Sequence, residues 1–302
     1  MATHDYVSSN YNLDREQKKF LKNDALSGKD IVDSVGRLCI MNLYLHGIGG
    51  DKSPIEVGDS LIADPGDRYD IILTNPPFGK RSSITIMNGE GKAVKESLTY
   101  ERDDFWTTTS NKQFNFLQHV KTLLKIDGKC GIVIPDNVLF EGGAGETVRR
   151  RLLHDYDVHT LLRLPTGVFY AQGVKANVLF FDRKPAREDP WTQKLWIYDL
   201  RTNKHFTLKE NPLREEDLKD FIECCNPENR FDREESERFK SFSYDELMQR
   251  DKVNLDIFWL KDESLEDLEN LPEPEVIAEE IVQNLEAALE EFRDVYESLK
   301  ER

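Results

Sequence analysis

The sequence predicts an α/β protein with a parallel sheet, followed by an acidic and mostly helical region. Through about residue 200, apolar residues alternate between helical spacing and the short continuous runs typical of buried strands. The charge then changes abruptly: residues 1–210 carry 29 Lys and Arg against 28 Asp and Glu, whereas residues 211–302 carry 12 against 29. We therefore expect two parts, an α/β domain over 1–210 and an acidic helical region over 211–302.

Composition excludes several classes of protein. No run approaches the ~18 consecutive apolar residues that cross a bilayer, and the N-terminus has no basic stretch followed by an apolar core. The four cysteines form no C-x-x-C pair, which argues against a disulfide framework and a structural zinc site. We expect a cytoplasmic chain without a membrane segment. The net charge of −16 argues against unaided nucleic-acid binding.

The first predicted elements are a helix and two strands. Apolar residues from Ile31 to Leu45 mark one helix face, which ends before Gly47. The run 54–57 predicts a short strand, and Tyr69–Leu73 predicts a buried strand that stops at Asn75-Pro76-Pro77-Phe78. A long polar stretch, 79–110, has little periodicity, and loops of that length are usually functional.

The remaining elements complete the predicted sheet. Ser110 is expected to cap a helix with apolar residues between Phe116 and Leu124, closed by Asp127-Gly128. A further helix is expected over 147–153. The other predicted strands are 130–134, 160–164, 177–181 and 194–199.

The C-terminal region is predicted to end in a long amphipathic helix. Apolar residues recur at spacings of three and four from Ile277 to Leu299. This stripe fits a helix packed on its own domain, and it fits a helix that pairs with a partner's coiled coil.

The tetrapeptide Asn75-Pro76-Pro77-Phe78 carries the strongest chemical signal. Two prolines after a strand make a stiff, extended turn, because proline fixes φ and keeps the preceding residue out of the α region. The Asn75 side-chain oxygen and the Pro76 carbonyl then offer two fixed acceptors, matching the two hydrogens of an exocyclic amine. Phe78 adds a flat surface for a planar ring. Because ligands of open α/β sheets bind beyond the carboxyl ends of strands, we interpret this turn as an amine-binding site rather than a structural turn.

Several stretches resemble the modification (M) subunit of type I restriction–modification systems, which are adenine-N6 DNA methyltransferases. Thr74–Gly79 resembles the catalytic motif of amino-directed methyltransferases that use S-adenosylmethionine. Further similar stretches follow in the same order as in the family. They are Met41–Ile48, Gly58–Leu61, Asp70–Gly79, Ile134–Phe140, Leu164–Phe169 and Gly173–Phe181.

The resemblance implies a Rossmann-like sheet and methyl transfer from S-adenosylmethionine to the N6 of an adenine flipped out of double-stranded DNA. In that reading Asn75, Pro76, Pro77 and Phe78 form the catalytic loop: Asn75 and Pro76 accept hydrogen bonds from N6, and Phe78 stacks on the base. Asp30 would bind the cofactor's ribose hydroxyls, and Asp59 would lie beside its adenine. The implied partners are a specificity (S) subunit and a restriction (R) subunit.

The chain departs from this family in one respect. A Gly-rich loop of the D-x-x-C-G-x-G-G type, expected after the first strand and before the segment that matches His4–Tyr6, is absent. Gly47–Gly50 follows a helix and cannot replace that loop. We therefore expect an incomplete sheet that lacks its first, central strand, with exposed edges and apolar surface.

Two alternatives stay open. The missing loop favours a catalytically silent module that acts only in assembly, and N-P-P-aromatic motifs also serve amines of RNA bases and protein glutamines. Lys80 and Arg81 fit ordinary solvated charges or phosphate contacts. Arg149–Arg151 fits a helix face better than a DNA contact.

Overall fold

The computed structural model describes residues 1–79, 83–87, 93–97, 99–169, 174–204, 206–207 and 211–261. Within 83–87 and 93–97 it describes the backbone only. The expected helix at 277–299 lies outside these residues. Among the described helices, none combines the length and the apolar composition needed to span a bilayer.

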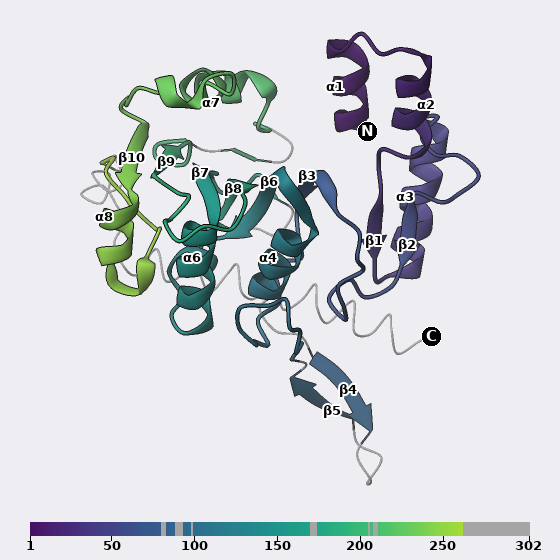
Figure 1. Ribbon diagram of the computed structural model, residues 1–302, viewed down its shortest axis with the longest axis horizontal. Helices are drawn as coiled ribbons and strands as arrows, with labels where there is room; N and C mark the ends of the chain where they lie inside the picture. The colour runs from purple at the N-terminus through teal and green to yellow at the C-terminus, as the bar shows by residue number, and fades with distance from the viewer. Residues whose placement is uncertain are drawn as a thin grey trace, which may run out of the picture.

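A six-stranded sheet forms the centre of the molecule (Figure 1). Its strand order is β10-β9-β7-β8-β6-β3. The strands are β3 (Tyr69–Thr74), β6 (Leu124–Pro135), β7 (Tyr156–Arg163), β8 (Ala176–Arg183), β9 (Lys194–Asp199) and β10 (Phe239–Ser243).

The sheet is mixed, whereas the sequence analysis predicted a parallel one. β3 and β6 are parallel, as are β7 and β9, but β8 runs antiparallel to both β6 and β7. The described part of the connection from β7 to β8 contains no helix, so this pair lacks the crossover that makes neighbouring strands parallel. The predicted strands at 130–134, 160–164, 177–181 and 194–199 are all confirmed, with longer bounds for the first three.

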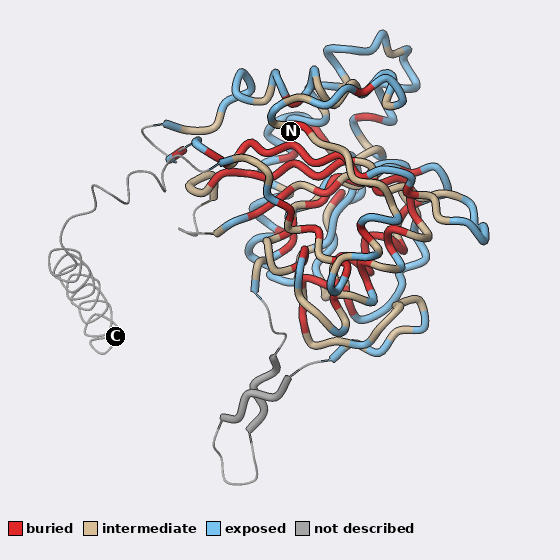
Figure 2. The backbone as a smooth tube through the Cα atoms, turned by 90° about the vertical axis from the view of Figure 1, so that its left-hand side faces the viewer, coloured by how far each residue is buried: buried red, intermediate tan, exposed pale blue. Residues whose placement is uncertain are grey.

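Two hydrophobic cores lie in the molecule, and the buried chain is concentrated in the central strands (Figure 2). The larger core contains residues from α4 (Lys112–Leu123), α6 (Ala144–Asp155) and the central strands. The smaller core joins β7, β8, β9 and β10 to α7 (Lys219–Cys225), where Phe180 stacks on Phe221 with ring centroids 6.2 Å apart.

β1 (Gly28–Asp30) and β2 (Ile55–Val57) form a separate two-stranded parallel sheet beside α3 (Asp33–Leu45). The predicted helix ending before Gly47 is confirmed, and Gly47 takes a positive φ of 73° that few other residues adopt easily. Two helices absent from the sequence prediction precede this unit: α1 (Ala2–Asn10) and α2 (Arg15–Asn23). Figure 1 places β3 as the strand of the large sheet nearest to β1.

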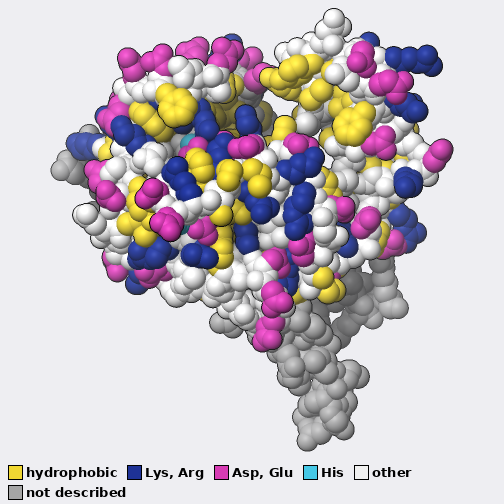
Figure 3. All heavy atoms as spheres, viewed as in Figure 1, with side chains coloured by type: hydrophobic (Ala, Val, Ile, Leu, Met, Phe, Trp, Pro, Cys, Tyr) yellow, Lys and Arg dark blue, Asp and Glu magenta, His cyan; other side chains and the backbone are white. Residues whose placement is uncertain are grey.

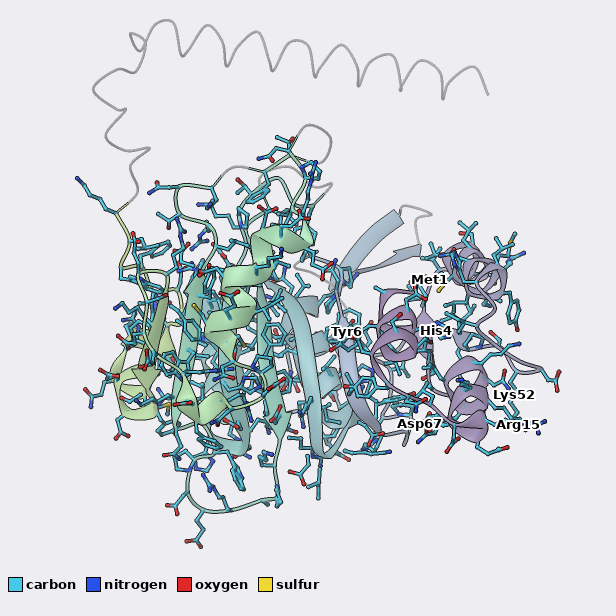
Figure 4. The ribbon with its side chains drawn as sticks, turned by 90° about the horizontal axis from the view of Figure 1, so that it is seen from above. Met1, His4, Tyr6, Arg15, Lys52 and Asp67 are labelled. Atoms are coloured by element: carbon cyan, nitrogen blue, oxygen red, sulfur yellow. The ribbon has the colours of Figure 1, made fainter. Side chains whose placement is uncertain are left out.

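Both facing strands have an unpaired edge. Within the described residues β1 pairs only with β2, and β3 pairs only with β6. The two-stranded sheet and the large sheet are therefore separate among the described residues, and the missing central strand expected from the sequence stays a prediction. α1 lies near the separation of the two sheets, and Tyr6 extends from its side facing the large sheet (Figure 4).

Four local predictions were wrong. Asp127-Gly128 does not close α4 but lies within β6, and the strand predicted as buried at 69–73 exposes Ile71 and Leu73. Asn111, not Ser110, caps α4, because the Asn111 side chain accepts a hydrogen bond from the backbone N–H of Gln113. The polar stretch 79–110 is not simply a loop: its backbone forms an antiparallel hairpin, β4 (Ser83–Met87) and β5 (Ala93–Ser97).

The described part of the acidic region, 211–261, contains strand β10 as well as helices. The helices are α7, α8 (Tyr244–Gln249) and the short 3-10 turns η1 (Glu215–Leu218), η2 (Arg230–Asp232) and η3 (Asp251–Val253); α5 (Asn137–Phe140) lies in the preceding part. β10 pairs with β9, and Leu255 and Ile257 enter the larger core. Residues 211–261 therefore share a sheet and a core with residues 1–210, and the domain boundary at residue 210 stays a prediction.

Candidate active site

The catalytic loop predicted from the sequence begins directly after β3. Thr74 is the last paired residue of the strand and lies opposite Ile132 of β6. In the loop, Pro76 is buried, Phe78 is half-buried, and Asn75 and Pro77 are exposed. The buried proline anchors the turn, so the exposed Asn75 side chain is presented at the carboxyl end of the sheet.

In the described part of the chain, neither predicted acceptor has an internal hydrogen-bond partner. Among the residues that the structure describes, none donates a hydrogen bond to the Asn75 side chain or to the Pro76 carbonyl. An exposed asparagine oxygen beside a fixed carbonyl can accept both hydrogens of one amino group. The amine-binding role of these two acceptors stays a prediction.

A buried side chain of α4 supports this loop from behind. Gln113, 5% exposed, donates from Nε2 to the Phe78 carbonyl at 2.6 Å, and its Oε1 accepts from Asn137 Nδ2, also at 2.6 Å. Asn137 also donates to Glu141 at 3.0 Å. Because each amide is fixed by a neighbour, this chain of hydrogen bonds holds the Phe78 backbone in one position.

Phe78 contacts a second aromatic ring. The rings of Phe78 and Phe169 meet edge to face, with centroids 5.3 Å apart and an interplanar angle of 81°. Phe169 follows β7, at the same end of the sheet. The two rings form an aromatic corner next to Asn75, suited to an additional planar group.

Asp30 and Asp59, the predicted cofactor residues, lie at the carboxyl ends of β1 and β2. The backbone N–H of Gly58 donates to the Asp30 carbonyl at 2.9 Å, which brings the two acidic residues together. Asp30 Oδ1 accepts from the backbone N–H of Val32 at 2.7 Å. Asp59 accepts from the Leu61 N–H at 2.9 Å and from the Tyr100 hydroxyl at 2.8 Å.

The segment before α4 links the two-stranded sheet to the large one. Tyr100 reaches Asp59, and Arg102 donates to the Leu61 carbonyl at 3.3 Å. Arg102 also forms an ion pair with Asp104 at 2.7 Å and contacts His119 of α4 at 3.1 Å. These contacts connect the loop after β2 to the helix behind the catalytic loop.

The carboxylates fit only one half of S-adenosylmethionine. The second oxygen of Asp30 has no partner among the described residues, so it can accept a hydrogen bond from a ribose hydroxyl. Asp59 is fixed by two hydrogen bonds, one to each carboxylate oxygen. Among the described residues, no strand is followed by a Gly-rich loop that opens a helix and could hold the methionine half.

Among the weaker candidates, the structure assigns a role to Arg149. Arg149 is buried and donates to four backbone carbonyls, those of Val138, Glu141, Lys252 and Val253, so it is a structural residue. Lys80 and Arg81 lie outside the described residues. Sequence reasoning missed Gln113 and Phe169; Phe169 lies within a stretch that matches the family, but Gln113 carries no local signal.

Comparison with known proteins gives one consistent family. Residues 2–263 match the family model described as N-6 DNA Methylase. The chain is 36% identical to the type I restriction enzyme StySPI methylase subunit of Salmonella potsdam and 35% identical to the EcoKI methylase subunit of Escherichia coli K12. Each alignment covers 95% of this chain and 59% of the relative.

A solved structure agrees with the sequence comparisons. The crystal structure of the EcoKI M protein superposes with a TM-score of 0.71 at 33% identity, covering 96% of this chain and 62% of that one. The chain thus spans about three fifths of the length of the relatives that it matches. From the fold, the catalytic loop and these matches, we conclude that the chain belongs to the N-6 DNA methylase family.

Proposed function

We propose that this chain is the catalytic part of an adenine-N6 DNA methyltransferase subunit of a type I restriction–modification system. One observation carries the proposal: Asn75 and Pro76 present two unengaged acceptors beside the ring of Phe78, at the carboxyl end of β3. The relatives named as type I methylase subunits support the same reading.

In this proposal the chain acts mainly by positioning the amine. Asn75 Oδ1 and the Pro76 carbonyl each accept one hydrogen of the adenine amino group, which orients the nitrogen lone pair toward the methyl donor. S-adenosylmethionine supplies an electrophilic methyl group when bound. Asp30 would hold the ribose hydroxyls of the donor and Asp59 would lie beside its adenine, so that the methyl group would be supplied to this nitrogen, which would release one proton to water.

The aromatic corner of Phe78 and Phe169 supports a base that has left the helix. An amino group within the stack cannot reach acceptors fixed in a loop, so the adenine must be extruded, at a cost of a few kcal/mol. Stacking on Phe78 offsets part of that cost, typically by about 1–3 kcal/mol per base.

We further propose that polypeptide from outside these 302 residues completes the methyl-donor site. It would insert a strand between β1 and β3 and supply the Gly-rich loop for the methionine half. The unpaired edges of both strands and the free oxygen of Asp30 support this arrangement. The relatives also contain about two fifths of their length beyond the region matched here.

DNA, a specificity subunit and a restriction subunit are the proposed partners. The charge pattern supports the need for partners, because a chain with a net charge of −16 repels phosphate. The amphipathic stretch 277–299 is our proposed contact for the specificity subunit. Deletion of residues 273–302 should then abolish binding of that subunit, and unchanged binding would refute this contact.

Calorimetry with S-adenosylmethionine tests the proposed division of the donor site. The chain alone should show no binding, and the chain mixed with the N-terminal part of a relative's methylase subunit should bind. Binding by the chain alone would overturn the proposed role of the added strand. No binding in either case would favour the silent assembly module.

Methylation by the assembled complex tests the catalytic loop. Asn75→Ala should lower N6-methyladenine formation by about 100-fold or more, because one of two fixed acceptors is lost. The control is calorimetric binding of S-adenosylmethionine, which should be unchanged in the variant. Full activity of Asn75→Ala would refute the proposed mechanism.

A further inference from the structure

A recess that the proposed catalytic site does not use lies at the other end of the strands of the large sheet, where β6 and β7 begin. It is formed where α4 and α6 end and where β6 and β7 begin, together with the chain that leaves β8. Its volume is about 450 Å³, within the range of small-molecule sites. The catalytic loop lies at the carboxyl end of β3, so the two sites are separated by the length of the parallel strands.

Cations dominate the lining of this recess. Five basic side chains contribute to it, against one carboxylate, Asp155; they are Lys121, Arg151, Arg183, Lys184 and Arg187. Two of them have a carboxylate within ion-pair distance. Arg151 lies 3.6 Å from Asp155, and Lys184 lies 3.1 Å from Asp127, an exposed carboxylate that leaves Lys184 available to a second anion.

The other three cations are oriented by backbone carbonyls rather than by carboxylates. Lys121 donates to the Asp104 carbonyl, Arg183 to the carbonyls of Thr122 and Leu124, and Arg187 to those of Asp189 and Pro190. A carbonyl fixes the direction of a guanidinium or an amine without cancelling its charge. The recess therefore keeps an excess of positive charge on fixed side chains. Elsewhere, basic and acidic side chains are mixed, as Figure 3 shows for one face of the molecule.

The charged form of Lys121 is disfavoured, because its amine is buried near other cations. Its side chain is 8% exposed, and burial lowers its pKa to about 8, with Arg183 and Arg102 acting in the same direction. Asp104 opposes the shift, but its carboxylate is already paired with Arg102. An anion in the recess would stabilise the buried ammonium group.

The remaining lining is apolar and aromatic. Trp106 lies with its ring centroid 4.8 Å from the Lys121 amine and packs edge to face against Tyr156 at 5.9 Å. Ile126 and Pro185 complete this side of the recess. A wall of this kind suits a planar ring, and arginine forks suit phosphate oxygens.

We propose that this recess is a nucleotide-binding site, with phosphate on Lys121, Arg183 and Lys184 and the base against the Trp106 side. The nucleotide could be free or part of a nucleic-acid strand, since both present the same chemical groups. The site is distinct from the pocket for the target adenine, and the proposal does not depend on methyl transfer.

Titration of the full chain with ATP tests the proposal, with binding followed by calorimetry. Lys121→Met removes the buried amine at nearly constant volume, and Lys184→Gln removes a half-buried charge. Each should weaken ATP binding by about tenfold or more, since hydrogen bonds to charged groups are lost. Lys18→Gln, an exposed lysine of α2, is the matched control and should leave the affinity unchanged.

Thermal unfolding of each variant checks that the fold is intact, and Lys184→Gln decides the result if Lys121→Met is unstable.

Two further ligands test whether the base is recognised and whether the nucleotide is free or part of a nucleic-acid strand. Weaker binding of inorganic tripolyphosphate than of ATP supports base recognition, and equal binding overturns it. Tighter binding of a 12-nucleotide single strand assigns the site to a nucleic-acid strand. Absence of ATP and oligonucleotide binding, or equal affinity in wild type and Lys184→Gln, overturns the site.

Discussion

At the scale of single residues, the catalytic loop depends on Gln113 for its position. Its amide bridges the Phe78 carbonyl and Asn137, and both contacts are 2.6 Å long. Asn75 and Pro76 need no support of their own, because the prolines make the turn rigid. The backbone of Phe78, by contrast, is held by a residue 35 positions further along the chain.

We expect Gln113→Glu to reduce the turnover of the assembled methyltransferase by about tenfold or more with little change in KM for S-adenosylmethionine. The carboxylate cannot donate to the Phe78 carbonyl, so the loop loses its support, while Asp30 and Asp59 are untouched. Steady-state kinetics measure the two parameters separately.

The matched control is Gln118→Glu, because Gln118 is equally buried in α4 but bonds to the backbone of Thr107. If Gln118→Glu lowers turnover as much as Gln113→Glu does, loss of helix stability explains both effects and the positioning role is wrong.

His119 makes stability sensitive to pH on the acid side. Burial lowers its pKa from 6.5 to about 4, and the positive charge of Arg102 acts in the same direction. Below pH 6.5 the unfolded chain binds a proton that the folded chain refuses, so stability falls between about pH 6.5 and pH 4 and changes little below that.

We expect this residue to contribute a loss of up to roughly 3 kcal/mol in the free energy of unfolding from pH 7 to pH 4. Urea unfolding at a series of pH values measures it. Carboxylates such as Asp64, whose pKa is lowered by Arg68, add losses in acid. The comparison is therefore with His119→Gln, which should show a shallower fall; identical slopes would contradict the assignment.

At the scale of elements, β3 is the least protected strand of the large sheet. Ile71 and Leu73 point to the same face and are each 62% exposed, whereas Ile72 on the other face packs against the larger core. The smaller core with α7 covers the same side of the sheet over β7, β8, β9 and β10 but not over β3. An exposed apolar strand with an unpaired edge invites association with another chain.

Replacing Ile71 and Leu73 together by threonine should reduce self-association of the isolated chain without lowering its unfolding temperature. Threonine keeps β propensity and removes exposed apolar surface. Size-exclusion chromatography with light scattering measures the association.

Ile72→Thr is the opposite control, since it should cost about 1–3 kcal/mol of stability by placing a hydroxyl against the core. Unchanged association of the double variant would mean that this face of β3 is not the adhesive surface.

At the scale of the whole molecule, the β1–β2 sheet and the large sheet share no strand pairing among the described residues. The link between them runs through Tyr100 and Arg102, which contact Asp59 and Leu61. Because these side-chain contacts replace a ladder of strand hydrogen bonds, the two-stranded unit is held less firmly than the large sheet.

Adding the N-terminal part of a relative's methylase subunit should therefore raise the unfolding temperature of the chain, and more so at higher concentration of the added segment, because it binds only the folded state. Differential scanning calorimetry measures the shift. The same addition to an Ile71→Lys, Leu73→Lys variant should give a smaller shift. A concentration-independent result would exclude a complementing strand.

Much of the fold follows from local sequence. The strands at 177–181 and 194–199 and the helix before Gly47 were predicted because buried strands and amphipathic helices differ in apolar period. The loop Asn75–Phe78 after β3 was predicted because Asn-Pro-Pro is stiff whatever surrounds it, and its catalytic role stays a prediction. The antiparallel direction of β8 was not, since strand direction depends on how the chain connects neighbours rather than on composition.

Residue types and their spacing were enough to predict the α/β class and the stiff loop Asn75–Phe78, and they show that this sequence contains no loop of the D-x-x-C-G-x-G-G type. Packing brought Gln113 to the Phe78 carbonyl, Phe169 to the Phe78 ring, and cations from α4, α6 and β8 into one recess. Contacts between residues distant in the chain depend on packing, and no local pattern encodes which side chains packing brings together.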